Sequence, residues 1–221
     1  MSDRLVLAFD TSFGPVSAAL ATYQGQVIAS DCAENVVGKQ AETLPPLVAR
    51  LLANAGVAFS RVGRIVVTVG PGAFTGVRVG LAFAKGLHLS TGAEILGVST
   101  LECLALQAQE AFPGLGVATL LDAKRGEVYA LALSGAGDVL SPAALLSVEQ
   151  AQSEIARVFQ GPFLLTGSGG ALVSGAFPTS TYVEMTSIDA RTLASRGGAM
   201  CVDNYVPLPA YLRAPDARLP A

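Results

Sequence analysis

Short runs of apolar residues, separated by turn residues, dominate the first hundred positions and predict strands. The runs cover residues 5–9, 16–22, 27–32, 65–69 and 95–98. Gly14-Pro15 and Gln24-Gly25 separate the first three runs and are typical turn pairs. We therefore expect an antiparallel meander of three strands, followed by two buried strands whose β-branched or apolar composition favours a sheet interior.

Two helices are predicted beside these strands. An apolar stripe at helical spacing predicts one over residues 43–55, with Pro45 and Pro46 in its first turn and Gly56 at its end. The second covers residues 76–90, is apolar on nearly every face and can be capped by Thr75. Small residues recur on it every four positions, as Gly76, Gly80 and Ala84 and as Ala82, Gly86 and Ser90. Either row allows another helix to approach closely, within the chain or from a partner.

The second half of the chain repeats the pattern of the first. Asp10 is followed by Gly14, Val16 and Ala18, and Asp122 by Gly126, Val128 and Ala130 at the same offsets. The later elements expected are strands over 117–121, 163–166 and 182–185 and helices over 147–159 and 189–202. Pro113-Gly114 places a boundary within residues 101–115. We assign residues 1–103 to an N-terminal subdomain and 104–221 to a reduced C-terminal one, each an α/β unit with a mixed sheet.

Composition excludes several classes of function. Hydrophobic residues make up 51% of the 221 residues and charged residues 14%, so we expect a folded protein whose apolar excess partly faces another subunit. A net charge of -3 without a Lys/Arg cluster argues against a nucleic-acid binder. No apolar stretch reaches the roughly 18–20 residues of a membrane span, and no export signal precedes the first strand. We expect a cytoplasmic protein that does not enter a membrane.

The sequence contains few residues that could bind a metal ion or act as a general acid or base. Cys32, Cys103 and Cys201 are widely spaced and odd in number, which favours reduced thiols over a disulfide framework. His88 is the sole histidine and lies on the apolar helix, and no Cys-x-x-Cys pair occurs. We therefore predict no metal ligands and no catalytic residues in this chain.

Two acidic strand ends are candidate phosphate-binding positions. Asp10, Thr11 and Ser12 would present a carboxylate and two hydroxyl groups, and Asp122 stands close to Arg125. Each segment also fits an ordinary turn in which the side chains satisfy backbone N–H groups.

Two glycine-rich loops follow predicted strands. Residues 70–76, Gly-Pro-Gly-Ala-Phe-Thr-Gly, resemble a phosphate cradle, because such a turn before a helix exposes backbone N–H groups. No Gly-Lys-Ser/Thr follows, so a Walker-type nucleotide site is not predicted. The glycines equally suit a sharp turn into a closely packed helix. The loop over residues 167–170 is similarly permissive.

Taken together, these motifs resemble the TsaB family, formerly called YeaZ. They are Leu-Ala-Phe-Asp-Thr-Ser (7–12), Gly-Pro-Gly-Ala-Phe-Thr-Gly-Val-Arg-Val-Gly (70–80), Ala-Lys-Gly-Leu (84–87), Gly-Val-Ser-Thr-Leu (97–101), Asp-Ala-Lys-Arg-Gly-Glu-Val-Tyr (122–129) and Tyr-Leu-Arg (211–213). The resemblance implies an actin/Hsp70/sugar-kinase-like (ribonuclease H-like) α/β fold of duplicated subdomains. It also implies a part in making threonylcarbamoyladenosine beside the anticodon of tRNA.

By the same resemblance, the chain is a non-catalytic activator of a TsaD-like subunit and works with a TsaE-like ATPase. ATP and metal would then belong to the partner subunits, tRNA would be met only through the complex, and the isolated chain would form a homodimer. The implied interface residues are Leu44, Leu47, Val48, Leu51, Phe74, Thr75, Gly76, Val77, Gly80, Phe83, Ala84 and Leu87. Asp10, Thr11, Ser12, Asp122 and Arg125 would be the remnant of a phosphate site.

The chain departs from the family pattern at Gln40, where relatives often carry histidine, so no role of that histidine is transferred. It ends soon after Arg213, and a basic C-terminal extension is therefore not expected. Three alternative functions remain. Asp10 and Asp122 suggest a nucleotide-dependent phosphotransferase or ATPase acting alone. A peptidase is a second alternative, although the sequence offers no metal ligands or base for it, and a purely structural homodimer is the third.

Overall fold

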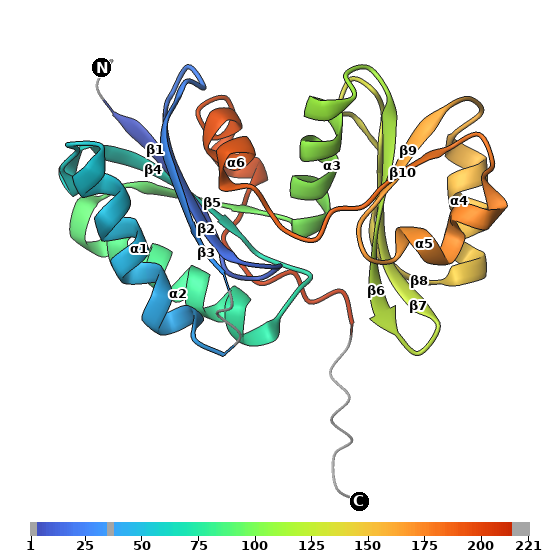
Figure 1. Ribbon diagram of the computed structural model, residues 1–221, viewed down its shortest axis with the longest axis horizontal. Coiled ribbons are helices and arrows are strands. Elements are labelled where there is room, and N and C mark those ends of the chain that lie inside the picture. Colours follow the sequence, from blue (N-terminus) through green and yellow to red (C-terminus); the bar gives the residue numbers. More distant parts are fainter. Residues whose placement is uncertain (1–3, 35–37, 214–221) are drawn as a thin grey trace, which may run out of the picture.

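Two five-stranded mixed sheets stand side by side with helices between and outside them (Figure 1). The structure is a computed structural model that describes residues 4–34 and 38–213. The first sheet has the order β3-β2-β1-β4-β5 and contains β1 (Leu5–Asp10), β2 (Val16–Thr22), β3 (Val27–Ala33), β4 (Val62–Thr68) and β5 (Glu94–Val98). The second has the order β10-β9-β6-β7-β8 and contains β6 (Gly116–Lys124), β7 (Glu127–Leu133), β8 (Val139–Ser147), β9 (Phe163–Thr166) and β10 (Thr181–Val183).

The predicted duplication is confirmed by the strand order. In each sheet the first strand of its half lies at the centre, pairs antiparallel with the second strand and pairs parallel with the fourth. Reading the second sheet from β8 to β10 gives the same sequence of positions as reading the first from β3 to β5. We call the two halves, each with its helices, the first and second lobes.

Helices cover both faces of each sheet. They are α1 (Gln40–Asn54), α2 (Phe74–Thr91), α3 (Thr100–Ala111), α4 (Val148–Val158), α5 (Gly170–Val173) and α6 (Ala190–Gly197), with short 3-10 turns at Phe59–Arg61, Ser174–Ala176 and Val202–Asn204. Helices α1 and α2 cover the outer face of the first sheet, and α4 and α5 cover that of the second (Figure 1). Helices α3 and α6 lie between the sheets, where one apolar cluster joins residues of both lobes. None of the helices in the described ranges is long and apolar enough to cross a membrane.

The starts of the first two helices differ from those predicted. Helix α1 begins at Gln40, because the Lys39 carbonyl oxygen accepts from the N–H groups of Glu42 and Thr43 at 3.1 and 3.0 Å. Pro45 and Pro46 therefore lie beyond its first turn, where their missing N–H groups cost helix hydrogen bonds.

Thr75 is not the cap of α2. The helix begins at Phe74, two residues before the predicted start at Gly76, and the N–H of Val77 donates to the Ala73 carbonyl at 3.0 Å. Ala73 is in turn held by its own N–H, which donates to the Ser12 carbonyl at 2.8 Å. A backbone contact with the end of β1 thus replaces the predicted side-chain cap.

The predicted C-terminal subdomain is corrected at its end. Helix α6 covers Ala190–Gly197, not 189–202, and it packs against β1 and β2 of the first sheet. Arg64 on β4 ends the helix, because its guanidinium donates to the carbonyls of Gly197, Gly198 and Met200 at 2.7, 3.1 and 2.9 Å. The second lobe therefore comprises β6 to β10 with α3, α4 and α5, and the chain then returns to the first lobe.

Candidate functional site

The end of β1 is sealed inside the protein. Asp10, Thr11 and Ser12 are each at most 3% exposed, and their polar atoms bond to one another and to the surrounding loop. Asp10 Oδ1 accepts from the Ser12 hydroxyl at 2.7 Å and from the Thr68 hydroxyl, and Asp10 Oδ2 accepts from the Phe13 N–H at 3.1 Å. The carboxylate is therefore satisfied without a ligand.

Burial dominates the electrostatics of this carboxylate. Loss of solvation raises the pKa of Asp10 above its ordinary value, although the hydrogen bonds from Thr68, Ser12 and Phe13 act in the opposite direction. A carboxylate that binds a phosphate-bound metal ion needs open oxygen positions, and none of its oxygens reaches solvent.

The glycine-rich loop closes directly over the same strand end. A Cβ atom on Gly72 would lie 2.6 Å from the Ser12 carbonyl oxygen, and one on Gly76 would overlap with the Thr11 carbonyl oxygen. The Thr11 hydroxyl donates to the Gly76 carbonyl at 2.7 Å. Glycine is required here for close approach of backbone to backbone, so the second interpretation of the loop, a turn into a closely packed helix, is confirmed.

Asp122 and Arg125 do not join Asp10 in one site. They belong to the β6–β7 hairpin, whose turn residues Lys124 and Arg125 have left-handed φ angles of 65° and 58°. Asp122 accepts from the Lys124 ammonium at 2.6 Å, and this hydrogen bond lowers the pKa of its carboxyl group. Asp10 is fully buried while Asp122 lies on a partly exposed hairpin, so the two carboxylates act separately.

No group of three or more metal-ligating side chains lies together in the described part of the chain. The Nδ1 atom of His88 lies 2.7 Å from the Ala93 carbonyl oxygen, which links the ring to the end of its own helix. The loop after β9 also packs against its neighbouring strand, since a Cβ on Gly167 would overlap with the Leu120 carbonyl oxygen.

The residues predicted to meet a partner fall into two groups. Most are buried in the first lobe: Leu44, Leu47, Val48, Leu51, Gly76, Val77, Gly80 and Ala84. Phe83 and Leu87 are partly buried, whereas Phe74 and Thr75 are exposed. The small-residue row Gly76, Gly80 and Ala84 thus serves packing within the chain, and contact with a partner stays a prediction.

The outer face of α1 and α2 carries a second set of small and apolar residues. On α1 it consists of Ala41, Pro45, Pro46, Ala49 and Ala53, and on α2 of Ala82, Gly86 and Leu89. Leu89 is 85% exposed, and a Cβ on Gly86 would meet no atom within 4 Å. We call these eight residues the outer helical face. These residues are exposed, together with charged residues of the same helices such as Arg50 and Lys85.

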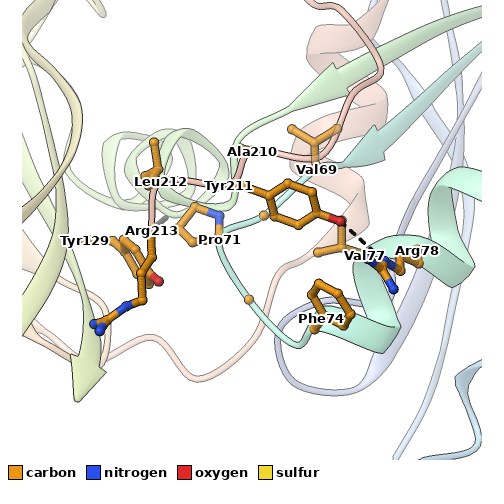
Figure 2. Close-up of a pocket in the computed structure, with 12 residues that line it drawn as sticks. Val69, Pro71, Phe74, Val77, Arg78, Tyr129, Ala210, Tyr211, Leu212 and Arg213 are labelled. Carbon is orange, nitrogen blue, oxygen red and sulfur yellow. Dashed lines mark hydrogen bonds between the residues drawn. The ribbon is translucent and has the colours of Figure 1, made fainter. Parts of the chain in front are cut away.

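A cavity of about 620 Å³ opens at the start of α2 (Figure 2). Its lining includes the backbone of Gly70–Gly72 from the first lobe, Tyr129 from the second and the chain after α6. The Arg78 guanidinium carbon lies 3.6 Å from the centre of the Phe74 ring, and its Nε donates to the Tyr211 hydroxyl at 3.3 Å. The sequence analysis missed this cluster. An aromatic residue and an arginine four positions apart on a helix were a usable signal, whereas nothing local pointed to Tyr211.

The two sheets of the same strand order place the chain among two-lobed α/β proteins with an actin-like or sugar-kinase-like fold. A ROK hexokinase from Thermus thermophilus shares the fold, with a TM-score of 0.51 at 14% identity over 88% of this chain and 98% of the hexokinase chain. The family model described as "TsaD: tRNA N6-adenosine threonylcarbamoyltransferase" matches residues 34–175.

Closer relatives identify the family. The solved structure of YeaZ from Pseudomonas aeruginosa has a TM-score of 0.79 and 30% identity, covering 95% of this chain and 100% of that one. The tRNA threonylcarbamoyladenosine biosynthesis protein TsaB of Buchnera aphidicola is 34% identical over 129 residues, 58% of this chain and 60% of that protein. The TsaB of Haemophilus influenzae is 33% identical over 130 residues, which cover 58% of this chain and 53% of that protein. The chain thus spans little more than half of these curated relatives. It belongs to the TsaB (YeaZ) family.

Proposed function

We propose that this chain is a cytoplasmic binding subunit that activates a TsaD-like subunit in the formation of threonylcarbamoyladenosine in tRNA. The names of its TsaB relatives support the pathway. The observation that supports a binding role is the closure of the Gly70–Gly76 loop over Asp10, which fills the space where a phosphate would have to lie. Chemistry is therefore assigned to the partner.

The outer helical face is the proposed contact with the TsaD-like subunit. Its residues are small or apolar, and the exposed Arg78 and Lys85 lie beside them on α2, so a partner would meet an apolar surface bordered by positive charge. Leu89, at 85% exposed, supplies an apolar side chain that is more exposed than Phe74 at the start of α2. Two copies of this chain can use the same face for a homodimer when the partner is absent. ATP, metal, the TsaE-like ATPase and tRNA would join at the level of the complex.

A phosphotransferase or ATPase acting alone receives no support. Asp10 is buried and Asp122 is paired with Lys124 on another lobe, so the two carboxylates that motivated this alternative do not converge. Binding of magnesium and ATP by the isolated chain, measured by calorimetry and abolished by Asp10→Ala, would revive it.

The partner proposal is tested by binding measurements with the TsaD-like protein of the same organism. Leu89→Glu places a charge on the outer helical face and should weaken the complex by at least about tenfold, because the carboxylate must be desolvated. Leu172→Glu is the matched control, since Leu172 on α5 is also exposed, at 49%. It should leave the affinity unchanged.

Equal affinity of both variants and the parent would contradict the assigned face, and absence of any complex at micromolar concentrations would contradict the function. Gly80→Arg would block the small-residue row that the sequence suggested as a helix contact, but it is unsuitable as a test of the partner interface. Gly80 packs against the Thr11 hydroxyl, so that substitution would disturb the fold and not only the surface.

A further inference from the structure

The chain after α6 crosses from the first lobe to the second. Figure 1 shows this segment running beneath α3 toward the lower ends of β6 and β7. We call residues 205–213 the strap. The predicted division assigned these residues to the C-terminal subdomain, whereas in the structure they contact both lobes.

The strap is bound to the first lobe along most of its length. The Gly97 N–H donates to the Tyr205 carbonyl at 2.9 Å, and the Ala210 N–H donates to the Val69 carbonyl at 2.8 Å. Gly97 allows this approach, because a Cβ there would lie 2.7 Å from the Val206 carbonyl oxygen. These backbone bonds extend from β5 and from the end of β4, so the strap moves with the first sheet.

Near its start the strap is bound to the second lobe by the Tyr205 hydroxyl, which donates to Glu102 on α3 at 2.7 Å, and at its far end by Arg213. Arg213 donates through Nη2 to the Ala123 carbonyl and to Glu127 Oε2, both at 2.8 Å. Ala123 and Glu127 flank the turn of the β6–β7 hairpin. The Arg213 side chain is 24% exposed and that of Glu127 is 36% exposed, so the pair is partly shielded from water.

The strap borders the cavity, whose lining residues Tyr129 and Leu212 also pack against the apolar cluster that joins the lobes. The apolar cluster of α3 and α6 joins the two lobes, and it includes Leu104 and Leu193. The cavity at Gly70–Gly72 has Tyr129 of the second lobe on one side and the first lobe on the other (Figure 2). Opening of the lobes about the α3–α6 contact would widen the cavity and break the Arg213 contacts.

We propose that the strap is a latch, in which Arg213 holds the second lobe closed against the first across this cavity. Arg213 ties the far end of the strap to the β6–β7 hairpin, whereas Tyr205 contacts α3 and packs against the apolar cluster about which the lobes would open. The latch concerns the shape of the chain itself and does not depend on the proposed partner.

Distance measurements between two spin labels on the isolated chain test the latch. Thr75→Cys on α2 and Leu172→Cys on α5 place labels on exposed positions of different lobes, with Cys32 and Cys201 replaced by serine and Cys103 left buried. Arg213→Ala should add a population at longer distance to the distribution of the labelled parent. Glu127→Gln, which removes the charge and keeps the shape, should shift it in the same direction and serves if Arg213→Ala does not fold.

Arg157→Ala is the matched control. Arg157 pairs with Glu154 at 2.6 Å inside the second lobe, so its loss removes a similar ion pair without touching the strap. Its distance distribution should equal that of the parent. If Arg213→Ala or Glu127→Gln also leaves the distribution unchanged in a folded chain, the latch is refuted.

Discussion

Arg64 offers the sharpest test of how the chain returns to its first lobe. Its guanidinium donates to three carbonyl oxygens at the end of α6 and twice to Glu94 Oε2, at 3.0 and 2.8 Å. Arg64→Met keeps the apolar stem and removes all five hydrogen bonds. The residue is only 8% exposed, so water cannot fully replace them.

The expected loss follows from the surroundings of each acceptor. Gly197 is buried, and a hydrogen bond from a charged group to such a carbonyl contributes about 1.5–3 kcal/mol. Gly198 and Met200 are partly exposed and can be hydrated, so they add about 0.5 kcal/mol each. The Glu94 side chain is 49% exposed, which limits its pair to about 1 kcal/mol or less. The sum is about 3 kcal/mol, or about 6–12 °C in melting temperature for a domain of this size.

Urea and thermal unfolding followed by circular dichroism at neutral pH measure this loss. Arg50→Met is the control, because the Arg50–Asp31 pair has the same chemistry but the Arg50 side chain is 53% exposed. That substitution should cost about 0.5 kcal/mol or less. If the two variants lose similar stability, the reasoning that α6 is held by Arg64 is wrong.

Two further predictions concern the sealed strand end and the helix beside it. Gly76→Ala should destabilise the chain by about 1–3 kcal/mol in urea unfolding, because the added Cβ would overlap with the Thr11 carbonyl oxygen. Gly86→Ala is the control and should be neutral or stabilising, because a Cβ there meets no atom within 4 Å. Equal effects of the two substitutions would contradict the close approach at Gly76. Burial raises the pKa of the Glu102 carboxyl group above its ordinary value of 4.5, so the folded chain binds the carboxyl proton more tightly than the unfolded chain does. The protonated carboxyl group therefore contributes to stability at low pH, and this contribution is lost as the pH rises through the raised pKa. Glu102→Gln keeps an oxygen acceptor for the Tyr205 hydroxyl and should reduce the loss of unfolding free energy as the pH rises above about 4. If the unfolding free energies of parent and variant change with pH in parallel, this prediction is wrong.

Strands and turns were predictable because their signals are local. The run over residues 5–9 became β1, Leu5–Asp10, and the equal offsets after Asp10 and Asp122 correctly predicted a duplication, which the structure shows as two sheets of the same strand order. Each inference needed only alternation, β-branched composition and turn residues, which act over a few positions. The TsaB resemblance rested on similarly local motifs, and the comparisons confirm it.

Tertiary contacts account for what the sequence did not show. An apolar stripe such as Leu44, Leu47 and Leu51 has the same spacing whether it covers its own sheet or a partner, and only the packed structure assigns it to the interior. Arg64 and Arg213 likewise act on segments more than eighty residues away, at Gly197 and Ala123. Nothing in the residues around either arginine identifies such a distant acceptor.

The duplicated lobes differ at the position that decides their chemistry. After β4 the glycine-rich loop leads into α2, whose 18 residues cover the end of β1 and bury Asp10. After β9 the corresponding loop leads into α5, which has four residues, and Asp122 stays at a partly exposed hairpin. A phosphate site between the lobes would need both carboxylates to face one opening. The long helix and the loop before it close over Asp10, whereas Asp122 is paired with Lys124 on an exposed hairpin, so the two carboxylates lie in different surroundings.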